Sequence, residues 1–498
     1  MVIEAFGQAL LNFLGAELWL FLIAGVIVGI LFGIIPGIGS MLALALCLPF
    51  LFMLTAEQGL PLLMAIQSVI YIGGSITAIL LGIPGTPTNA ATVLDGYPMT
   101  QKGEAGRALG AALTSCGTGS IITAIVALAL VPLLLPMVMA LRSADMVFII
   151  LLGFTFIAAL GEGSMVKALI SAGVGILISS IGFQAVTAVD RFTFGTIYLY
   201  NGIPVVPLCL GIFGIPEAIA LAVRGGTIAK SGVIVKGMQG VWQGVRDVFR
   251  HKMIVLQSSI IGFVIGIIPG IGAMISTFVA YGRARQSSKY PEKFGTGCVE
   301  GVIAPECAND AKEGGSLLIT LALGIPGSAP MVLLLAAMML LGLIPGPEML
   351  TSHLELSLTL LLVILVASVV GVVICLPIVP HLAKISIVPS RILAPLVLVV
   401  IVIGTYAYQE ELNDVIALLI CGGVGIIMRS FGYNRPALIL GYVLGRRFEK
   451  YLFIALAASG PLFFMRPISL ILIFIIIALF TYGPIKGVFQ RGRGVKKP

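Results

Sequence analysis

The chain has 498 residues, of which 59% are hydrophobic and 10% are charged, and its formal net charge is +8. Soluble domains carry about 25% charged residues, so the composition excludes an ordinary soluble globular protein and indicates a surface covered mostly by lipid. The cysteines form no Cys-x-x-Cys pair and the three histidines lie far apart. The sequence therefore predicts no zinc site, no catalytic residue and no enzymatic triad.

Long uncharged runs predict membrane segments along the whole chain. A spanning helix needs roughly 20 apolar residues, and this length predicts an all-α polytopic membrane protein with about 12 transmembrane segments plus re-entrant hairpins. The predicted segments lie near 18–35, 41–54, 60–82, 108–136, 145–160, 165–182, 204–223, 253–268, 271–282, 314–345, 355–379, 389–408, 412–428 and 467–485.

The basic residues predict how the chain is oriented. No lysine or arginine precedes Gly25, whereas basic residues cluster in the loop 224–252 and in the tail 486–497. Basic loops stay in the cytoplasm, so we expect an external N-terminus, a cytoplasmic central loop and a cytoplasmic C-terminus. The basic patches therefore indicate topology, and no nucleic-acid partner is expected.

Two glycine-rich segments occur twice. Residues 33–39 recur identically as 266–272, a shift of 233 residues, and residues 73–85 resemble 314–327, where the proline moves from 84 to 326, a shift of 242. These ordered pairs predict two structural repeats, 1–235 and 236–498. Because the first begins outside and the second after a cytoplasmic loop, the repeats are expected to be inverted, as in many secondary transporters. The basic group at 446–450 disagrees with strict inversion.

Four Pro-Gly breaks interrupt the apolar runs, at positions 36–37, 84–85, 269–270 and 326–327. Proline breaks a helix, and an unpaired backbone group in lipid costs several kcal/mol. Such breaks are therefore tolerated where they are buried in protein or line a wet cavity. Freed carbonyls there can coordinate a cation, and half-helix N-termini can hold an anion.

The two hairpin tips that follow the second break of each half carry small residues and hydroxyl groups. The segments 85–92 and 327–330 suit recognition of a carboxylate by hydroxyls and backbone amides. An alternative is that the hydroxyl residues only cap the interrupted helices; these are Thr86, Thr88, Thr92 and Ser328.

A polar stretch from Glu300 to Glu313 lies directly before the second hairpin. Ionisable residues in or beside a membrane are functional candidates, so Glu306, Asn309 and Asp310 are candidate cation ligands or gate residues. The alternative is a cytoplasmic loop with helix-capping acids. For the polar segment after the first tip, a solvated loop is the favoured interpretation; its charged residues are Asp95, Lys102, Glu104 and Arg107.

Several motifs together resemble the large membrane subunit, the TctA family, of tripartite tricarboxylate transporters. The resemblance covers essentially the whole chain and is carried by residues 36–39, 73–87, 91–98, 300–306, 324–329 and 466–469. It implies an elevator-like subunit of the bacterial inner membrane. It also implies a small membrane subunit and a periplasmic solute-binding protein as partners, and import of citrate-like carboxylates with sodium or protons.

The resemblance also assigns roles to residues of this chain. It implies that the hairpin tips bind substrate and that the two Pro-Gly-Ile-Gly breaks supply cation-site backbone. Two departures, Gly82 and Asp310, stand where the family's pattern has asparagine and put the tricarboxylate label in doubt. The expected substrate-binding residues are Gly85, Thr86, Pro87, Thr88, Asn89, Gly327, Ser328, Ala329 and Pro330, and the expected cation-binding residues are Pro36, Gly37, Gly39, Pro269, Gly270, Gly272, Asn309 and Asp310.

Three function classes follow from these observations. The first is a sodium- or proton-coupled carboxylate importer with no cofactor besides the coupling ion. The second is a passive anion channel, or a carrier for another small organic anion; no ring of charge or filter motif supports a channel. The third is an intramembrane enzyme, which lacks a clustered His, Cys and carboxylate constellation in this sequence.

Overall fold

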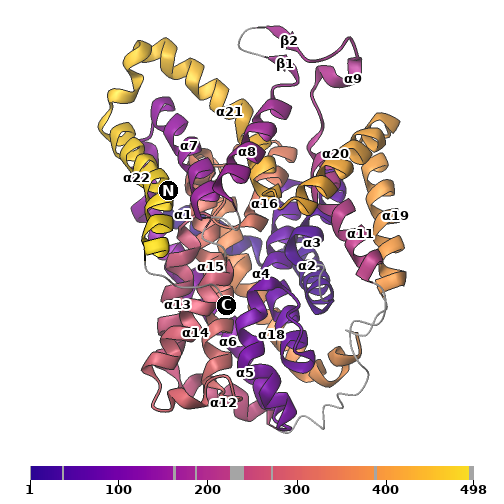
Figure 1. The fold of residues 1–498 in the computed structure, drawn as a ribbon, viewed down its shortest axis with the longest axis vertical. Coiled ribbons are helices and arrows are strands. Elements are labelled where there is room, and N and C mark those ends of the chain that lie inside the picture. The colour runs from indigo at the N-terminus through magenta and orange to yellow at the C-terminus, as the bar shows by residue number, and fades with distance from the viewer. Residues whose placement is uncertain are drawn as a thin grey trace.

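The computed structural model describes residues 2–35, 39–160, 164–184, 188–224, 240–270, 273–385 and 390–492. Three of the expected cation-site residues, Pro36, Gly37 and Gly272, lie outside these described residues. Within them the chain is almost entirely helical, which confirms the predicted all-α class (Figure 1).

The first half of the chain contains the helices α1 to α11 and a small pair of strands. Its elements are α1 (Val2–Asn12), α2 (Ala16–Ile34), α3 (Gly39–Cys47), η1 (Leu48–Met53), α4 (Ala56–Leu81), η2 (Pro87–Asn89), α5 (Ala90–Gln101), α6 (Ala105–Met139), α7 (Ser143–Leu160), α8 (Met165–Ser179), β1 (Gly182–Gln184), β2 (Val189–Arg191), α9 (Ile197–Tyr200), α10 (Val205–Cys209), the π-helical turn η3 (Leu210–Gly214) and α11 (Ile215–Arg224).

The second half contains the helices α12 to α22. Its elements are α12 (Val241–Arg250), α13 (Lys252–Ile267), α14 (Ala273–Ser287), η4 (Pro291–Lys293), α15 (Glu300–Leu323), α16 (Ala329–Leu340), α17 (Pro347–Thr351), α18 (Leu354–Ile385), α19 (Ser390–Gln409), α20 (Leu412–Ser430), α21 (Arg435–Ser459), η5 (Gly460–Met465) and α22 (Pro467–Gly492).

Seven helices of the described residues are long and apolar enough to cross a membrane, and the count is eight if α12 and α13, bent by 78° at their junction, form one span. Six further apolar helices are shorter. The chain is thus a multi-pass membrane protein, while the figure of about 12 spans (a sequence estimate from the length rule) stays a prediction.

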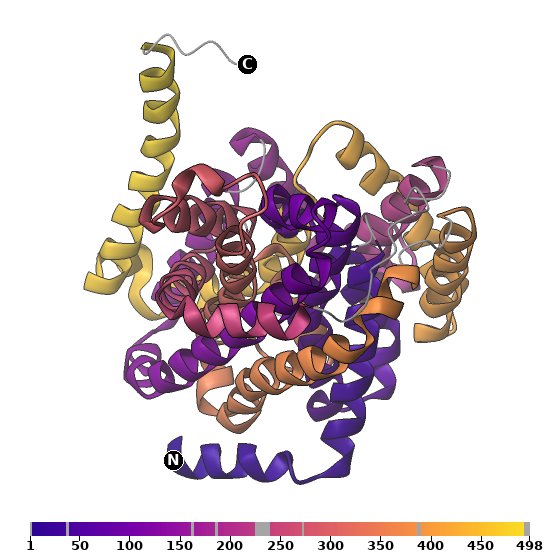
Figure 2. The same cartoon turned by 90° about the horizontal axis from the view of Figure 1, so that it is seen from below.

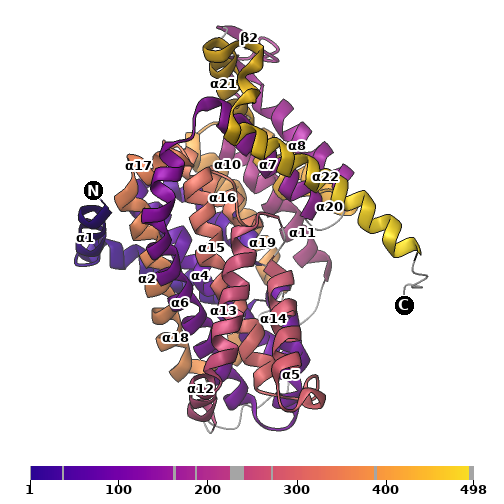
Figure 3. The ribbon, with the colours of Figure 1, turned by 90° about the vertical axis from the view of Figure 1, so that its left-hand side faces the viewer.

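Two long helices, α4 and α15, form the interior of the molecule. Helix α4 packs on α2 and α18, and α15 packs on α6, α13 and α14 (Figure 3). Every residue of α15 from 301 to 318 is buried. The stretch Glu300–Glu313 is therefore a buried helix, and its interpretation as a cytoplasmic loop is wrong. Four ionisable side chains of this helix must find their partners inside the protein.

Glycines let the outer helices approach these two interior helices closely. A Cβ atom on Gly33 of α2 would clash with the Ile70 carbonyl of α4, and one on Gly266 of α13 would clash with the Lys312 carbonyl of α15. Gly29 and Gly262, one turn earlier, meet the carbonyls of α4 and α15 in the same way. These backbone-to-backbone contacts hold α2 on α4 and α13 on α15.

Peripheral elements extend from this interior. The antiparallel strands β1 and β2 and helix α9 project at one end (Figure 1), and the C-terminal α22 projects on the opposite side from α1 (Figure 2). Tyr198 of α9 donates a hydrogen bond to the Asp414 carboxylate at the start of α20 (2.7 Å). Burial and that carboxylate raise the pKa of Tyr198 above its ordinary value, so the phenol remains the donor.

Candidate functional site: a buried polar cluster between two hairpin tips

Two hairpins form where α4 and α15 end. Both helices stop at a glycine in the left-handed conformation, Gly82 (φ 66°, ψ 17°) and Gly324 (φ 69°, ψ 19°). Glycine adopts this conformation without the steric penalty of a Cβ atom. An Ile-Pro-Gly segment follows each helix end and leads into η2 and α5 in one case and into α16 in the other. The predicted breaks at Pro84 and Pro326 are therefore the turns of two helical hairpins.

Each hairpin tip lies against the outer helix of its own half, close to where that helix breaks. Gly85 packs on the Gly33 carbonyl of α2, and Gly327 packs on the Gly266 carbonyl of α13. These outer helices end in matching extended residues, Ile35 (φ −87°, ψ 107°) and Ile268 (φ −89°, ψ 106°). The tip of each hairpin and the end of its outer helix therefore come together.

The first tip is held by its own polar side chains. The Thr86 hydroxyl donates to Asn89 Oδ1 (2.6 Å) and lies 2.8 Å from the Thr88 hydroxyl, and Asn89 Nδ2 donates to the Tyr71 carbonyl (3.3 Å). No side-chain capping bond is made by Thr86, or by Ser328 at the equivalent tip. Helix capping therefore does not account for these two hydroxyl residues.

Glu306 joins the first tip to α15. Its carboxylate accepts hydrogen bonds from Asn89 Nδ2 (3.0 and 3.3 Å), from the Thr92 hydroxyl and from the Cys116 thiol of α6 (3.2 Å). All three partners donate, which is the arrangement that a charged carboxylate requires. Glu306 has no exposed surface. It therefore fixes the position of the tip against α15 by charge-assisted hydrogen bonds.

Asn309 and Asp310 follow one turn later and are also fully buried. The Asp310 carboxylate lies near the Cys116 thiol and interacts electrostatically with Glu306, Lys312 and Glu313. Neither carboxylate oxygen of Asp310, nor the amide oxygen or nitrogen of Asn309, has a hydrogen-bond partner among the described residues. Buried polar atoms normally have partners, so these side chains present free oxygen ligands of the kind that hard cations take.

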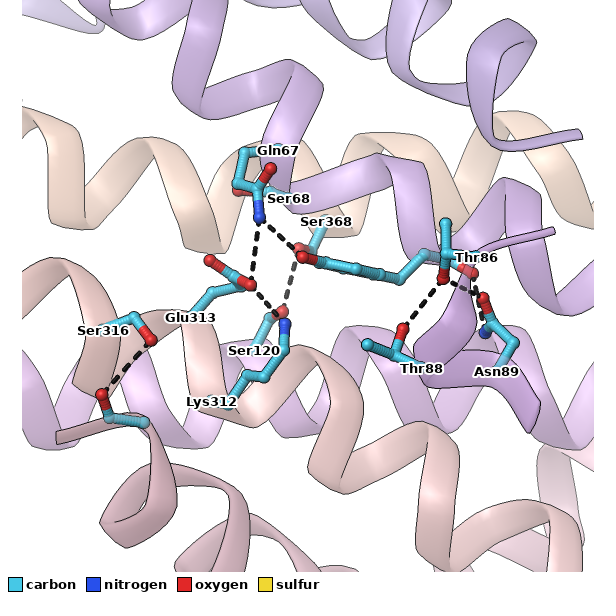
Figure 4. A network of polar contacts seen from close by, with 12 residues as sticks. Gln67, Ser68, Thr86, Thr88, Asn89, Ser120, Lys312, Glu313, Ser316 and Ser368 are labelled. Atoms are coloured by element: carbon cyan, nitrogen blue, oxygen red, sulfur yellow. Dashed lines mark hydrogen bonds and ion pairs between the residues drawn. The ribbon is translucent and has the colours of Figure 1, made fainter. Parts of the chain in front are cut away.

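A third group surrounds Lys312 and Glu313 (Figure 4). The Lys312 ammonium pairs with Glu313 Oε1 and lies 3.8 Å from the centroid of the Tyr71 ring of α4. Gln67 of α4 donates from Nε2 to the Tyr71 hydroxyl (2.6 Å) and to Glu313 Oε1 (3.2 Å). Ser40, just after the first Pro-Gly-Ile-Gly break, also interacts with Tyr71.

The second tip makes fewer hydrogen bonds than the first among the described residues. The Gly327 amide donates to the Thr320 hydroxyl (3.2 Å), and Ser316 of α15 donates to the Gly266 carbonyl (3.2 Å). The Ser328 hydroxyl is buried without a hydrogen-bond partner in the described part of the chain. Ser328 therefore retains a free donor and acceptor near the end of α13.

The remaining expected cation-site residues are placed differently. Gly39 begins α3 with φ +64° and has open space beside it, whereas Gly270 (φ +80°) packs on the Phe156 carbonyl of α7. The described residues contain no group of three or more His, Cys, Asp or Glu side chains that could hold a metal ion.

Asp95 corrects one interpretation of the sequence. It is fully buried and accepts hydrogen bonds from the backbone amides of Gly295 (2.9 Å), Gly297 (2.8 Å) and Cys298 (2.8 Å) and from the Tyr281 hydroxyl (2.9 Å). The solvated loop expected here is therefore wrong for Asp95, whereas Lys102 and Glu104 of the same segment are exposed as expected. Asp95 instead ties α5 to the segment that leads into α15.

Sequence reasoning missed Gln67, Tyr71, Cys116 and the Lys312–Glu313 pair. Gln67 and Tyr71 lie in an uncharged run of apolar residues, where single polar side chains resemble ordinary core positions. Their four-residue spacing on one helix face was the available signal, and Lys312 and Glu313 were visible as charges directly before a predicted hairpin.

The chain is similar in sequence to several known proteins. The sequence profile of the tripartite tricarboxylate transporter TctA family matches residues 19–440. An uncharacterized 52.8 kDa protein of Agrobacterium vitis, in the TAR-I ttuC′ 3′ region, is 34% identical over 435 residues, covering 87% of this chain and 86% of the relative. A second uncharacterized protein, in the TAR-II ttuC′ 3′ region, is 32% identical over 211 residues, or 42% of this chain and 87% of the relative. No solved structure matches.

Proposed function

Because this chain belongs to the tripartite tricarboxylate transporter TctA family, we propose that it imports citrate-like di- or tricarboxylates together with sodium or protons. In this proposal it is the large subunit in a bacterial inner membrane. It works with a small membrane subunit and receives its substrate from a periplasmic solute-binding protein. The family is one of transporter subunits, and a non-enzymatic role agrees with it.

The observation that carries the proposal is the set of free polar atoms on α15 beside the first tip. The four side-chain oxygen and nitrogen atoms of Asn309 and Asp310 are buried and unpartnered. A buried charged group without a partner costs several kcal/mol, so the two Asp310 oxygens favour a cation or a proton as their partner, and the Asn309 amide oxygen can join them as a cation ligand. Because Glu306, one turn before Asn309 and Asp310 on α15, accepts hydrogen bonds from Asn89 and Thr92, a cation at this position would act close to the first tip.

The charges of the buried side chains explain why substrate binding and cation binding would be coupled. α15 buries three carboxylates, those of Glu306, Asp310 and Glu313, and one ammonium, that of Lys312. An anionic substrate that enters near this cluster is repelled until the excess negative charge is neutralised. Cation binding would therefore precede or accompany carboxylate binding, which is the linkage that a symporter needs.

The tips are the proposed substrate site. Gly85–Asn89 and Gly327–Pro330 provide backbone amides and hydroxyls, and the free Ser328 hydroxyl supports a role in binding. Such groups recognise carboxylates by donating hydrogen bonds.

We also propose that the two halves, 1–235 and 236–498, are inverted repeats that move in an elevator-like manner. The paired glycine contacts support this: Gly33 meets Ile70 as Gly266 meets Lys312, with shifts of 233 residues on the outer helices and 242 on the inner helices. The matching helix ends at Gly82 and Gly324 add to it.

The test is uptake into proteoliposomes that contain the chain with its small subunit and its binding protein. Radiolabelled citrate, succinate, malate and acetate would be offered with inward sodium, proton or no gradients. The proposal expects sodium- or proton-driven accumulation of at least one of the first three. Asn309→Ala and Asp310→Ala should abolish accumulation with normal membrane insertion. Equal uptake of all anions down their own gradients alone would favour a passive channel, and accumulation of acetate alone would favour a carrier for another class of anion.

A further inference from the structure

The Lys312–Glu313 pair has features that a structural ion pair does not need. Among the described residues, Lys312 is the only lysine or arginine that is buried, with 1% of its surface exposed. Taking both charges out of water offsets most of their attraction, so such a pair adds little stability. Its position, between the first tip and the second, suggests a role in binding.

Each member of the pair retains unused hydrogen-bonding capacity. Glu313 Oε2 and Gln67 Oε1 are buried and have no partner within the described part of the chain. The Lys312 ammonium has three donors, and among the described residues it donates to one acceptor, Glu313 Oε1. The Lys312 ammonium also makes a cation–π contact with the Tyr71 ring, whose centroid lies 3.8 Å away. The pair can therefore accept an additional anion at Lys312 and an additional cation at Glu313.

The pair is linked to both tips through the backbone. Asn89 of the first tip donates to the carbonyl of Tyr71, the residue whose ring lies under Lys312. Ser316, one turn after Lys312 on α15, bonds the Gly266 carbonyl on which Gly327 of the second tip packs. One helical turn rises about 5.4 Å, so Lys312 lies within about one turn of groups that touch each tip.

We propose that Lys312 binds a carboxylate group of the transported anion in exchange for Glu313, and that the released Glu313 carboxylate takes up one sodium ion or one proton. This inference rests on the proposed function and adds one coupling event to it. Charge balances at each step. Before the exchange, the ammonium neutralises Glu313. Afterwards the substrate carboxylate neutralises the ammonium, and the incoming cation neutralises Glu313.

The exchange makes carboxylate and cation binding mutually dependent at a single pair. Without a cation, a substrate that displaces Glu313 leaves a buried, unpaired carboxylate close to Asp310, and this opposes binding. With a cation, that penalty is absent. The titratable and charged groups that face Glu313 are Lys312 and Tyr71, with Asp310 nearby on the same helix.

The test is citrate binding by the purified chain at sodium concentrations from 1 to 100 mM at constant pH, and at a series of pH values at constant sodium. Glu313→Gln should lower the slope of log Kd against log sodium concentration, or against pH if the cation is a proton, by about one. This corresponds to about tenfold less change in Kd per tenfold change in the cation. Lys312→Gln should weaken citrate binding at least tenfold at every cation concentration, and Lys312→Arg should restore most of it.

The controls are Glu57→Gln and Lys102→Gln, the same substitutions at exposed positions, and both should behave as wild type. The double variant Lys312→Gln/Glu313→Gln removes both charges, so its weak citrate binding would exclude misfolding by an unpaired charge as the cause. An unchanged slope in Glu313→Gln, or wild-type affinity in Lys312→Gln, would overturn this inference. The proposed function would still stand if the wild type showed sodium-driven uptake. Absence of any cation-driven uptake by the wild type would overturn both.

Discussion

Replacing Thr92 by valine tests whether Glu306 holds the first hairpin tip on α15. Thr92 has no exposed surface, and its hydroxyl donates to the Glu306 carboxylate. Valine keeps the volume and removes the donor, while Asn89 and Cys116 continue to donate. A hydrogen bond to a charged group contributes about 1.5–3 kcal/mol. The substitution should therefore favour release of the tip by about 10- to 150-fold, since each 1.4 kcal/mol is a factor of ten.

Hydrogen exchange followed by mass spectrometry measures this release directly. Amides in the peptide 84–92 should exchange about 10- to 150-fold faster in Thr92→Val than in wild type when opening is the limiting equilibrium. Thr100→Val is a matched control on the same helix, because the Thr100 hydroxyl donates to the Ile79 carbonyl within its own hairpin (2.8 Å). The control should leave exchange in 84–92 nearly unchanged. Equal protection of this peptide in Thr92→Val and wild type would refute the role assigned to Glu306.

Three further predictions concern packing, the second tip and the C-terminal helix. Gly266→Ala should destabilise the protein by about 1–3 kcal/mol in thermal unfolding, because its Cβ would meet the backbone of α15. The control Gly282→Ala, which has open space around it, should not be destabilised. Equal melting temperatures for the two variants would contradict the close helix contact. Ser328→Trp should abolish carboxylate uptake while membrane insertion, followed by cell fractionation, stays normal, and normal uptake would remove this tip from the site. Asp145→Asn should weaken the bond from Arg466 (2.6 Å) and make α22 more sensitive to limited proteolysis; an unchanged digestion pattern would show that α22 is held by other contacts.

The helical class and the hairpins could be predicted because each has a local cause. Apolar runs of sufficient length specify membrane helices, and a Pro-Gly step inside such a run interrupts the backbone whatever surrounds it. The structure places helix ends at Gly82 and Gly324, directly before the prolines at 84 and 326. Asn309 and Asp310 were also recognisable, since charges and amides beside apolar segments are rare.

Burial of the polar stretch could not be predicted from its composition. Glu300–Glu313 contains five ionisable residues, which by themselves suit a solvated loop, and the packing of α6, α13 and α14 around α15 decides the matter. The alignment of the two halves is similar. Aligned by sequence, Gly73 corresponds to Gly314. In the structure it corresponds to Gly315, because Gly73 and Gly315 each meet a carbonyl of the outer helix at matching positions. Tertiary contact, which the letters do not contain, sets this register.

The measurement that tests the central claim most directly is the reversal point of citrate flux in proteoliposomes with fixed citrate and sodium gradients and a clamped membrane potential. If buried side chains on α15 bind a cation together with the carboxylate, the point at which net flux stops must move when either the citrate gradient or the sodium or proton gradient is changed. Flux that stops wherever the electrochemical gradient of citrate alone is zero, at every cation gradient, would contradict coupled transport by this protein.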